Sequence, residues 1–251
     1  MVRPFVCIEV TGGQSTWAPL TGAARPERIF GFHQSQVRER AAALFYSNKT
    51  ISHSAHVVDR NLELAASAGA TRMVRAFPLP PGKSEAPLPA GEFVLASPLA
   101  GWRAKQWPLE HYGKLAALLK RELGVPLVLD GASAAMPVLS EVEGAVPHAS
   151  TLAGLIYATR RAAAVVGVDS GPLHVAAALG KPGVALYGPT DPARNGPYGD
   201  SLRVFRHAEA ATTYKRGDAI DVSMARITPG DVFEALRAVL GARSRPAGCR
   251  S

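Results

Sequence analysis

The residues best suited to chemistry lie in one short segment between two predicted strands. Asp169, Ser170 and Gly171 follow the apolar run 163–168, and Pro172 then begins a helical stretch that ends at Gly180. Proline suits the first helical turn, where its missing N–H has no partner to lose. The free N–H groups of that turn and the positive end of the helix dipole favour an anion such as a diphosphate. The segment therefore predicts an anion site.

A second turn follows the next predicted strand, 184–187. It runs Gly188-Pro189-Thr190-Asp191, and the side chains of Thr190 and Asp191 are able to bond a sugar or a ribose. Because the carboxyl ends of parallel strands share one edge of a sheet, we expect both turns to line the same crevice. His174, in the first helical turn, is expected to face that crevice too.

These residues also have a simpler interpretation, which the pattern leaves open. Asp and Ser are common helix N-caps whether or not a ligand is present, and short motifs match by chance. A single histidine such as His174 is more often packed or solvated than catalytic. Residue types and spacing alone do not choose between a capped helix and an anion site.

The elements that must position these turns alternate between strands and helices. The strands are apolar throughout, which is typical of a parallel sheet covered on both faces. The sequence thus predicts an α/β, Rossmann-like domain at 92–241, with residues 132–147 unassigned. Its predicted strands are 93–96, 125–129, 163–168 and 184–187, and its helices begin at Pro108, at Ser150 or Thr151, at Pro172, and at Pro229 after the cap Thr228.

The N-terminal part is smaller and less regular. Strands are predicted at 5–10 and 28–32 and a helix at 56–68, too few for a complete doubly wound sheet within residues 1–76. Five prolines in residues 77–91 exclude helix and strand, so this segment is predicted to be a linker. Residues 242–251 are predicted to be a disordered tail.

Composition and the absence of certain motifs argue against several functional classes. The net charge of +8 favours anionic partners, but basic and aromatic residues do not alternate as they do on nucleic-acid surfaces, so nucleic acid is not expected. Cys7 and Cys249 belong to no CxxC pair, and the pair His53 and His56 lacks an acidic partner, so no metal site is expected. The sequence shows neither a signal peptide nor a membrane span, and a cytoplasmic location is the expectation. Without a Gly-x-Gly-x-x-Gly run after a strand, a nicotinamide-dependent oxidoreductase is not favoured.

Several segments together resemble the signature of glycosyltransferase family 9, which includes the ADP-heptose:lipopolysaccharide heptosyltransferases. The similarity covers most of residues 5–240. The segments that carry it are 169–174, 176–182, 188–194 and 196–199, with further similarity at 56–62, 105–108 and 227–232.

The resemblance implies a GT-B fold, with two Rossmann-like domains that bind the acceptor (N-terminal) and the nucleotide-sugar donor (C-terminal). It implies inverting transfer of heptose from ADP-heptose to the Kdo or heptose residues of the lipopolysaccharide inner core, without a cofactor. Such an acceptor would allow peripheral contact with the inner face of the inner membrane. Lys105 is the implied partner of the donor phosphates, and Trp107 is expected to pack at the helix start. The other implied donor-binding residues are Asp169, Ser170, Gly171, His174, Gly188, Thr190 and Asp191.

The chain departs from the family at its beginning. Family members open with a strand, a Leu-Gly-Asp turn and a helix, and that Asp is thought to take the proton from the acceptor hydroxyl. Residues 5–10 instead resemble a later strand, so the N-terminal domain is expected to be incomplete. Three explanations stay open: a fragment or misassigned start, a degenerate homologue that binds nucleotide sugar without catalysis, or a substitute base. Glu9 is the only candidate base and is better interpreted as an exposed acid, so we assign no catalytic residue.

Overall fold

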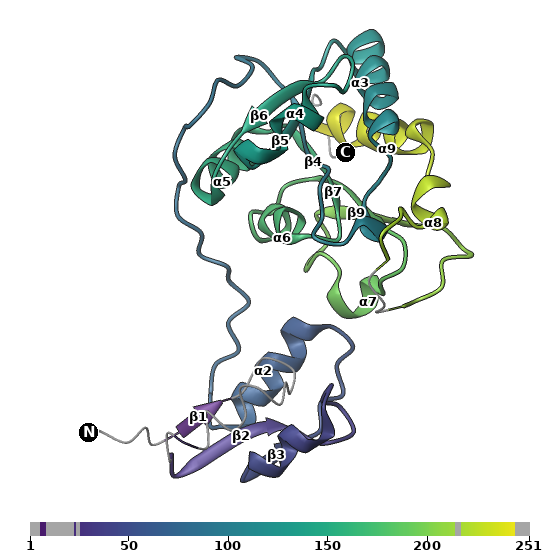
Figure 1. The fold of residues 1–251 in the computed structure, drawn as a ribbon. Coiled ribbons are helices and arrows are strands. Elements are labelled where there is room, and N and C mark those ends of the chain that lie inside the picture. The colour runs from purple at the N-terminus through teal and green to yellow at the C-terminus, as the bar shows by residue number, and fades with distance from the viewer. Residues whose placement is uncertain (1–5, 9–22, 24–25, 214–216, 244–251) are drawn as a thin grey trace, which may run out of the picture. The chain divides into compact units, whose positions relative to one another are not determined.

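The computed structural model describes residues 6–8, 23, 26–213 and 217–243, and the chain divides into two compact units (Figure 1). The first unit is Met1–Arg75 and the second is Ala76–Ser251. Each unit has its own buried apolar core.

The C-terminal unit is built on six parallel strands whose order reverses once. The order in the sheet is β6-β5-β4-β7-β8-β9, so the chain proceeds outward from β4 to β6 and then continues on the other side of β4 at β7. The reversal creates a switch point between β4 and β7, where open α/β sheets collect ligands. The strands are β4 (Val94–Ser97), β5 (Leu127–Gly131), β6 (Val146–Ala149), β7 (Ala164–Val168), β8 (Gly183–Tyr187) and β9 (Leu202–Arg206).

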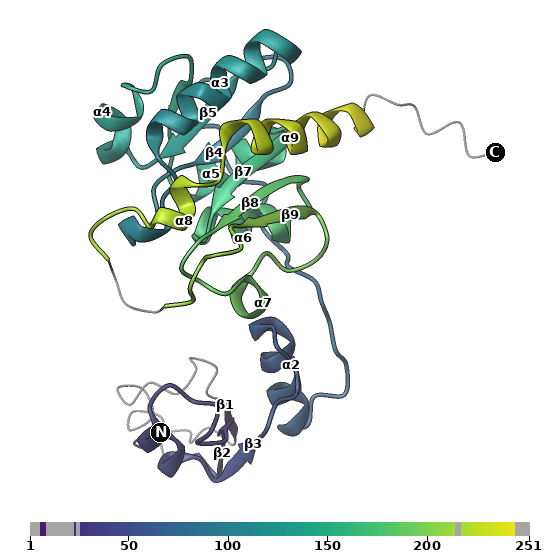
Figure 2. The same ribbon diagram turned by 90° about the vertical axis from the view of Figure 1, so that its right-hand side faces the viewer.

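Helices cover both faces of this sheet (Figures 1 and 2). Alternate residues of one strand enter the two cores: Val166 packs with α3 (Leu109–Leu123) and α9 (Pro229–Arg243), and Val165 packs with α5 (Leu152–Arg161) and α6 (Gly171–Ala178). This two-sided burial confirms the predicted α/β class. Short helices fill the connections: η2 (Arg103–Lys105), η3 (Ser133–Ala135), α4 (Met136–Leu139), α7 (Pro192–Asn195) and α8 (Val222–Ala225).

Local signals explain where the long helices begin and end. Thr151, not Ser150, caps α5, because its hydroxyl accepts the N–H of Ala153. Thr228 accepts the N–H of Asp231 at the start of α9. Gly124 ends α3 with a φ of 67°, a left-handed conformation that favours glycine.

The segment 77–91, which was predicted to be a linker, falls within the C-terminal unit. It contains no helix or strand, as its prolines require, and it makes hydrogen bonds with α5. Lys83 N–H donates to the Ala153 carbonyl, and the Arg160 guanidinium donates to the carbonyls of Leu79 and Pro80. Proline prevents regular hydrogen bonding of its own segment but does not prevent docking on a helix.

Other boundaries also differ from expectation. The unassigned stretch 132–147 holds η3, α4 and the start of β6, and the edge strand β9 was not predicted. The last helix continues to Arg243, two residues into the predicted tail, and residues 244–251 lie outside the described part of the chain.

The N-terminal unit contains a three-stranded parallel sheet in the order β1-β2-β3. Its strands are β1 (Val6–Ile8), β2 (Arg28–Phe32) and β3 (Asn48–Thr50), and its helices are η1 (Arg40–Phe45) and α2 (Val57–Ser67). The predicted strands at 5–10 and 28–32 and the helix at 56–68 correspond to β1, β2 and α2, whereas η1 and β3 were not predicted. Phe30 and Phe32 of β2 pack on Leu64 of α2. None of the described helices is both long and apolar enough to span a bilayer.

Candidate functional site

The switch point brings together two residues that are 64 positions apart in the sequence. Lys105, in η2 after β4, places its Nζ 2.6 Å from Oδ2 of Asp169, which directly follows β7. Their side chains are only 17% and 9% exposed, respectively. A charge-assisted hydrogen bond with so little solvent fixes the position of the ammonium group.

Further groups surround this ion pair. The Lys105 ammonium lies 4.4 Å from the centroid of the Trp102 ring, and the Nε2 atom of His174 lies 3.9 Å from Oδ1 of Asp169. Burial raises the pKa of the Tyr187 hydroxyl at the end of β8, and the negative charge of Asp169 raises it further. Asp169 is thus the centre of an electrostatic cluster built by three neighbouring strands.

The start of α6 is not capped by the side chain of its N-cap residue. Ser170 has an extended backbone, and its hydroxyl donates to the carbonyl of Val168 at 3.1 Å instead of accepting from α6. Gly171 is exposed, and a Cβ built on it would meet no atom within 4 Å. The interpretation of Ser170 as a side-chain cap is therefore wrong, and the first turn of α6 is accessible to a ligand.

Residues of the turn after β8 also have structural contacts. Oδ1 of Asp191 accepts the N–H of Ala193 at 2.9 Å and so caps α7. A Cβ on Gly188 would lie 2.6 Å from Cγ of Met224, so this glycine allows α8 to pack. Thr190 is 3% exposed, and its hydroxyl has no hydrogen-bond partner in the described part of the chain. Of the three residues, Thr190 is the one whose side chain has a buried polar atom without a partner among the described residues.

A cavity of about 600 Å³ adjoins the start of α6. It opens between the carboxyl ends of β4 and β5 and the first turns of α5 and α6. The polar part of its lining was not recognised as a site in the sequence, although the Asp-Gly pair ending β5 was visible there. The lining residues are Ser97, Leu99, Asp130, Gly131, Ala132, Ala134, Ala135, Ser150, Thr151, Leu152, Leu155 and Pro172.

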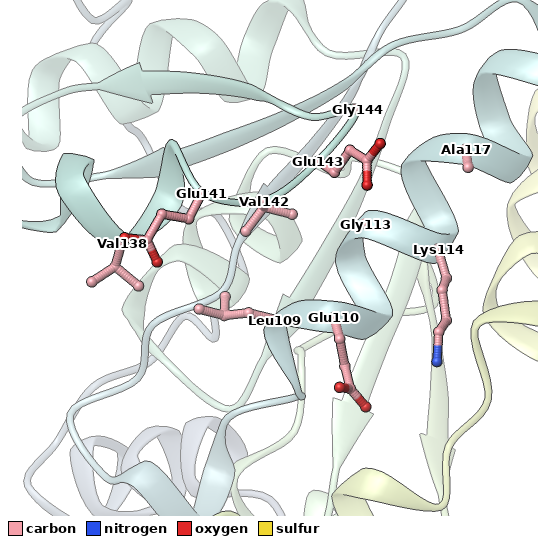
Figure 3. A pocket seen from close by; sticks show the side chains of 10 residues that line it. All are labelled: Leu109, Glu110, Gly113, Lys114, Ala117, Val138, Glu141, Val142, Glu143 and Gly144. Carbon is pink, nitrogen blue, oxygen red and sulfur yellow. The ribbon is translucent and has the colours of Figure 1, made fainter.

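A second hollow, of about 660 Å³, lies between α3 and the segment 138–144 (Figure 3). Its charged lining is mostly acidic, with Glu110, Glu141 and Glu143 against the single cation Lys114. It contains none of the predicted site residues, and its charge disfavours phosphates. It is not part of the candidate site.

Two of the remaining candidates have structural contacts of their own. The imidazole of His56 accepts the N–H of Val58 and caps α2. Trp107 is buried, as expected, and its indole N–H donates to the Ile227 carbonyl at 2.9 Å. Among the described residues, no cluster of three or more His, Cys, Asp or Glu side chains is suited to a metal ion. Glu9 and Cys249 lie outside the described residues.

Comparison with known proteins gives one family. The model of glycosyltransferase family 9 (heptosyltransferase) matches residues 14–222. Lipopolysaccharide heptosyltransferase 2 of Escherichia coli (strain K12) is 33% identical, over 73% of this chain and 61% of that protein. Lipopolysaccharide heptosyltransferase 1 of the same strain is also 33% identical, over 70% of this chain and 58% of that protein. The chain thus spans about three fifths of the length of these relatives.

Solved structures agree in fold. The structure of E. coli heptosyltransferase WaaC with ADP has a TM-score of 0.72 and 24% identity, covering 95% of this chain and 73% of that one. The structure of E. coli ADP-heptose lps heptosyltransferase II has a TM-score of 0.71 and 24% identity, covering 96% of this chain and 77% of that one. The GT-B architecture expected from the sequence is therefore confirmed.

Proposed function

Because the chain belongs to glycosyltransferase family 9, we propose that it binds a nucleotide-diphosphate sugar at the start of α6 and transfers the sugar. The observation that carries this proposal is the Lys105–Asp169 ion pair beside the uncapped first turn of α6. A fixed ammonium group and a helix N-terminus at one switch point form a site for a diphosphate.

The arrangement is suited to the departure of a diphosphate. In an inverting transfer, an acceptor oxygen attacks the anomeric carbon as the bond from that carbon to the β-phosphate oxygen breaks. The electron pair of the broken bond leaves with the nucleoside diphosphate, and the acceptor hydroxyl transfers its proton to a general base or to solvent water. Lys105 and the dipole of α6 would stabilise the negative charge that grows on the leaving diphosphate.

Asp169 is proposed to position Lys105 while leaving some of its N–H donors available to a ligand. An ammonium group has three N–H donors, so Lys105 is able to keep its bond to Oδ2 of Asp169 while it donates to phosphate oxygens. His174 reaches the other carboxylate oxygen with a side chain that is 46% exposed, so it can also meet a ligand. The hydroxyl of Thr190 is proposed as a further donor to the bound sugar nucleotide.

The substrates are proposed from the relatives. We infer ADP-heptose as donor and the Kdo- and heptose-containing inner core of lipopolysaccharide as acceptor, because the curated relatives are lipopolysaccharide heptosyltransferases. The acceptor would be bound through the N-terminal unit on the cytoplasmic side, with the net charge of +8 favouring the anionic membrane surface.

Donor binding is tested by calorimetry with ADP and AMP. Lys105→Ala should weaken ADP binding by about tenfold or more, which corresponds to the loss of one charge-assisted bond, and should affect AMP less. Lys120→Ala removes an exposed lysine of α3 and serves as the matched control. A wild-type chain with no measurable affinity for ADP would refute the proposed site.

Transfer is tested separately. The chain is incubated with ADP-heptose and heptose-deficient lipopolysaccharide, and both released ADP and heptosylated product are measured. Donor binding without product would support the alternative, a non-catalytic nucleotide-sugar-binding protein, and would contradict the proposed transfer reaction.

A further inference from the structure

A buried acid–imidazole–hydroxyl cluster lies next to the candidate site and has no role in the proposal above. Asp130 at the end of β5 is 5% exposed, and His148 of β6 is 2% exposed. Nδ1 of His148 lies 2.9 Å from Oδ1 of Asp130, and the Ser150 hydroxyl donates to the same oxygen at 2.7 Å. The two strands hold the cluster in register, because Asp130 pairs with His148 in the sheet.

The geometry excludes a nucleophilic triad. Ser150 is bonded to the carboxylate and not to the imidazole, so His148 is not placed to activate its hydroxyl. Instead, both donors converge on Oδ1, which fixes the plane of the Asp130 carboxylate. None of the described residues donates a hydrogen bond to the other oxygen, Oδ2.

Asp130 also lines the cavity of about 600 Å³ that adjoins α6. Most of the other lining groups are apolar, among them Leu99, Leu155 and Pro172. Oδ2 is not among the described side-chain atoms that are fully buried without a partner, so it keeps contact with the solvent of the cavity and is able to accept a hydrogen bond there. A ligand hydroxyl group in the cavity would supply the donor that Oδ2 lacks among the described residues.

We propose that Asp130 is a specificity-determining residue that accepts hydrogen bonds from the ribose hydroxyls of the donor nucleotide. The inference rests on the proposed function, because it needs the diphosphate at the start of α6. From there, Pro172 and Ser97 lead along the cavity to β5, two strands or about 10 Å from β7. The ribose is the group next to the diphosphate, and an acid at a strand end is suited to its hydroxyls.

This proposal names a different acidic partner for the ribose from the one suggested by the sequence. Asp191 was that earlier candidate, and its Oδ1 accepts the N–H of Ala193 at the start of α7. His148 and Ser150 are positioning residues in the new assignment: they hold Oδ1 so that Oδ2 faces the ligand.

The test compares ADP with 2′,3′-dideoxy-ADP by calorimetry. The wild-type chain should bind ADP about tenfold or more tightly than the dideoxy analogue, which is the range expected for hydrogen bonds to a charged acceptor. Asp130→Asn should lose most of this preference and keep its affinity for the dideoxy analogue. Glu122→Gln makes the same change of charge at an exposed acid of α3 and should keep the preference.

The outcomes separate the two proposals. A wild-type chain that binds neither nucleotide refutes the proposed function, whereas equal affinity for both nucleotides overturns only the role of Asp130. If Asp130→Asn lowers both affinities equally, the cluster is structural and the inference is wrong. If Asp130→Asn does not fold, Ser150→Ala replaces it in the test, because this variant retains the carboxylate. Ser150→Ala should lower the preference for ADP without changing the affinity for the dideoxy analogue. An unchanged preference would overturn the inference.

Discussion

Thr190 buries a hydroxyl group that bonds to no described residue, in the loop between β8 and α7. A buried polar group without a partner costs the native state about 1–3 kcal/mol. A bound ligand that supplied the missing partner would remove this cost. One substitution of Thr190 should therefore change the free energy of unfolding and the affinity for the ligand in different directions.

Thr190→Val keeps the shape of the side chain and removes the hydroxyl. We expect the free energy of unfolding of the unliganded protein to stay the same or to rise by about 1 kcal/mol, because the unpaired oxygen is gone. ADP-sugar affinity should fall several-fold. Urea unfolding and calorimetry measure the two effects, and a loss of stability with unchanged affinity would show that Thr190 serves the fold alone.

His111 makes stability depend on pH. It packs against the buried ring of Trp107, and burial lowers its pKa, with Glu110 opposing the shift. The native state thus favours neutral His111, whereas the unfolded chain takes up a proton near the ordinary pKa of about 6.5. Its destabilising effect is absent well above that pH and grows as the pH falls through the unfolded pKa toward the lower native one.

We therefore expect His111→Leu to flatten the loss of stability between about pH 7 and pH 5. One extra proton bound by the unfolded state changes stability by at most about 1.4 kcal/mol per pH unit. Urea unfolding across this range measures the slope for both chains. Identical slopes would mean that His111 titrates alike in both states.

At the scale of elements, the start of α5 is stabilised by a residue from the proline-rich segment. The Glu85 carboxylate accepts the Thr151 N–H and the Thr151 hydroxyl, each at 2.7 Å, and these bonds lower its pKa. Gly154 makes room for this contact, because a Cβ there would lie 2.4 Å from Oε2 of Glu85. The carboxylate also complements the helix dipole.

Gly154→Ala should therefore lower the melting temperature by a few degrees, although alanine normally stabilises a helix. Glu85→Ala in the same chain should recover part of that loss, since the carboxylate that the new methyl group meets is gone. Thermal unfolding of the two single variants and the double variant measures this coupling. Additive losses would show that Gly154 and Glu85 act independently.

The segment from β7 to β8 was predictable because its signals are local. The apolar runs, Pro172 at the helix start and Gly180 after its end each restrict the backbone within a few residues. β9 gave no such signal: Arg203 and Arg206 interrupt its apolar residues, and two of the five residues of this edge strand are exposed. A strand at a sheet edge need not be apolar on both faces.

Contacts between distant segments were not predictable. Lys105 and Asp169 were each expected at the site, but their direct ion pair follows from the order of β4 and β7 in the sheet. For Asp130, the sequence pattern indicated only the end of a strand. Its hydrogen-bond partner His148 lies 18 residues away, on a strand that the pattern did not predict. Proline content predicted the backbone of residues 77–91 but not the surface of α5 that receives it.

At the scale of the whole molecule, the boundary between the units has a measurable consequence. The C-terminal unit begins at Ala76, and its extended first segment contributes Leu88 to the core beneath α5. The same segment carries Glu85 and the backbone carbonyls that receive Arg160. If the segment were a passive linker, its removal would not change the stability of the C-terminal unit.

Two fragments test the boundary. Residues 76–251 should fold alone and bind ADP within about threefold of the full chain, because the candidate donor site and its core lie in that unit. Residues 92–251 contain every predicted donor-binding residue but lack the segment on α5, so their melting temperature should be several degrees lower. Because α5 lines the cavity that contains Asp130, ADP affinity should fall as well. Equal stability and affinity of the two fragments, measured by calorimetry, would restore the linker interpretation and place the boundary at residue 91.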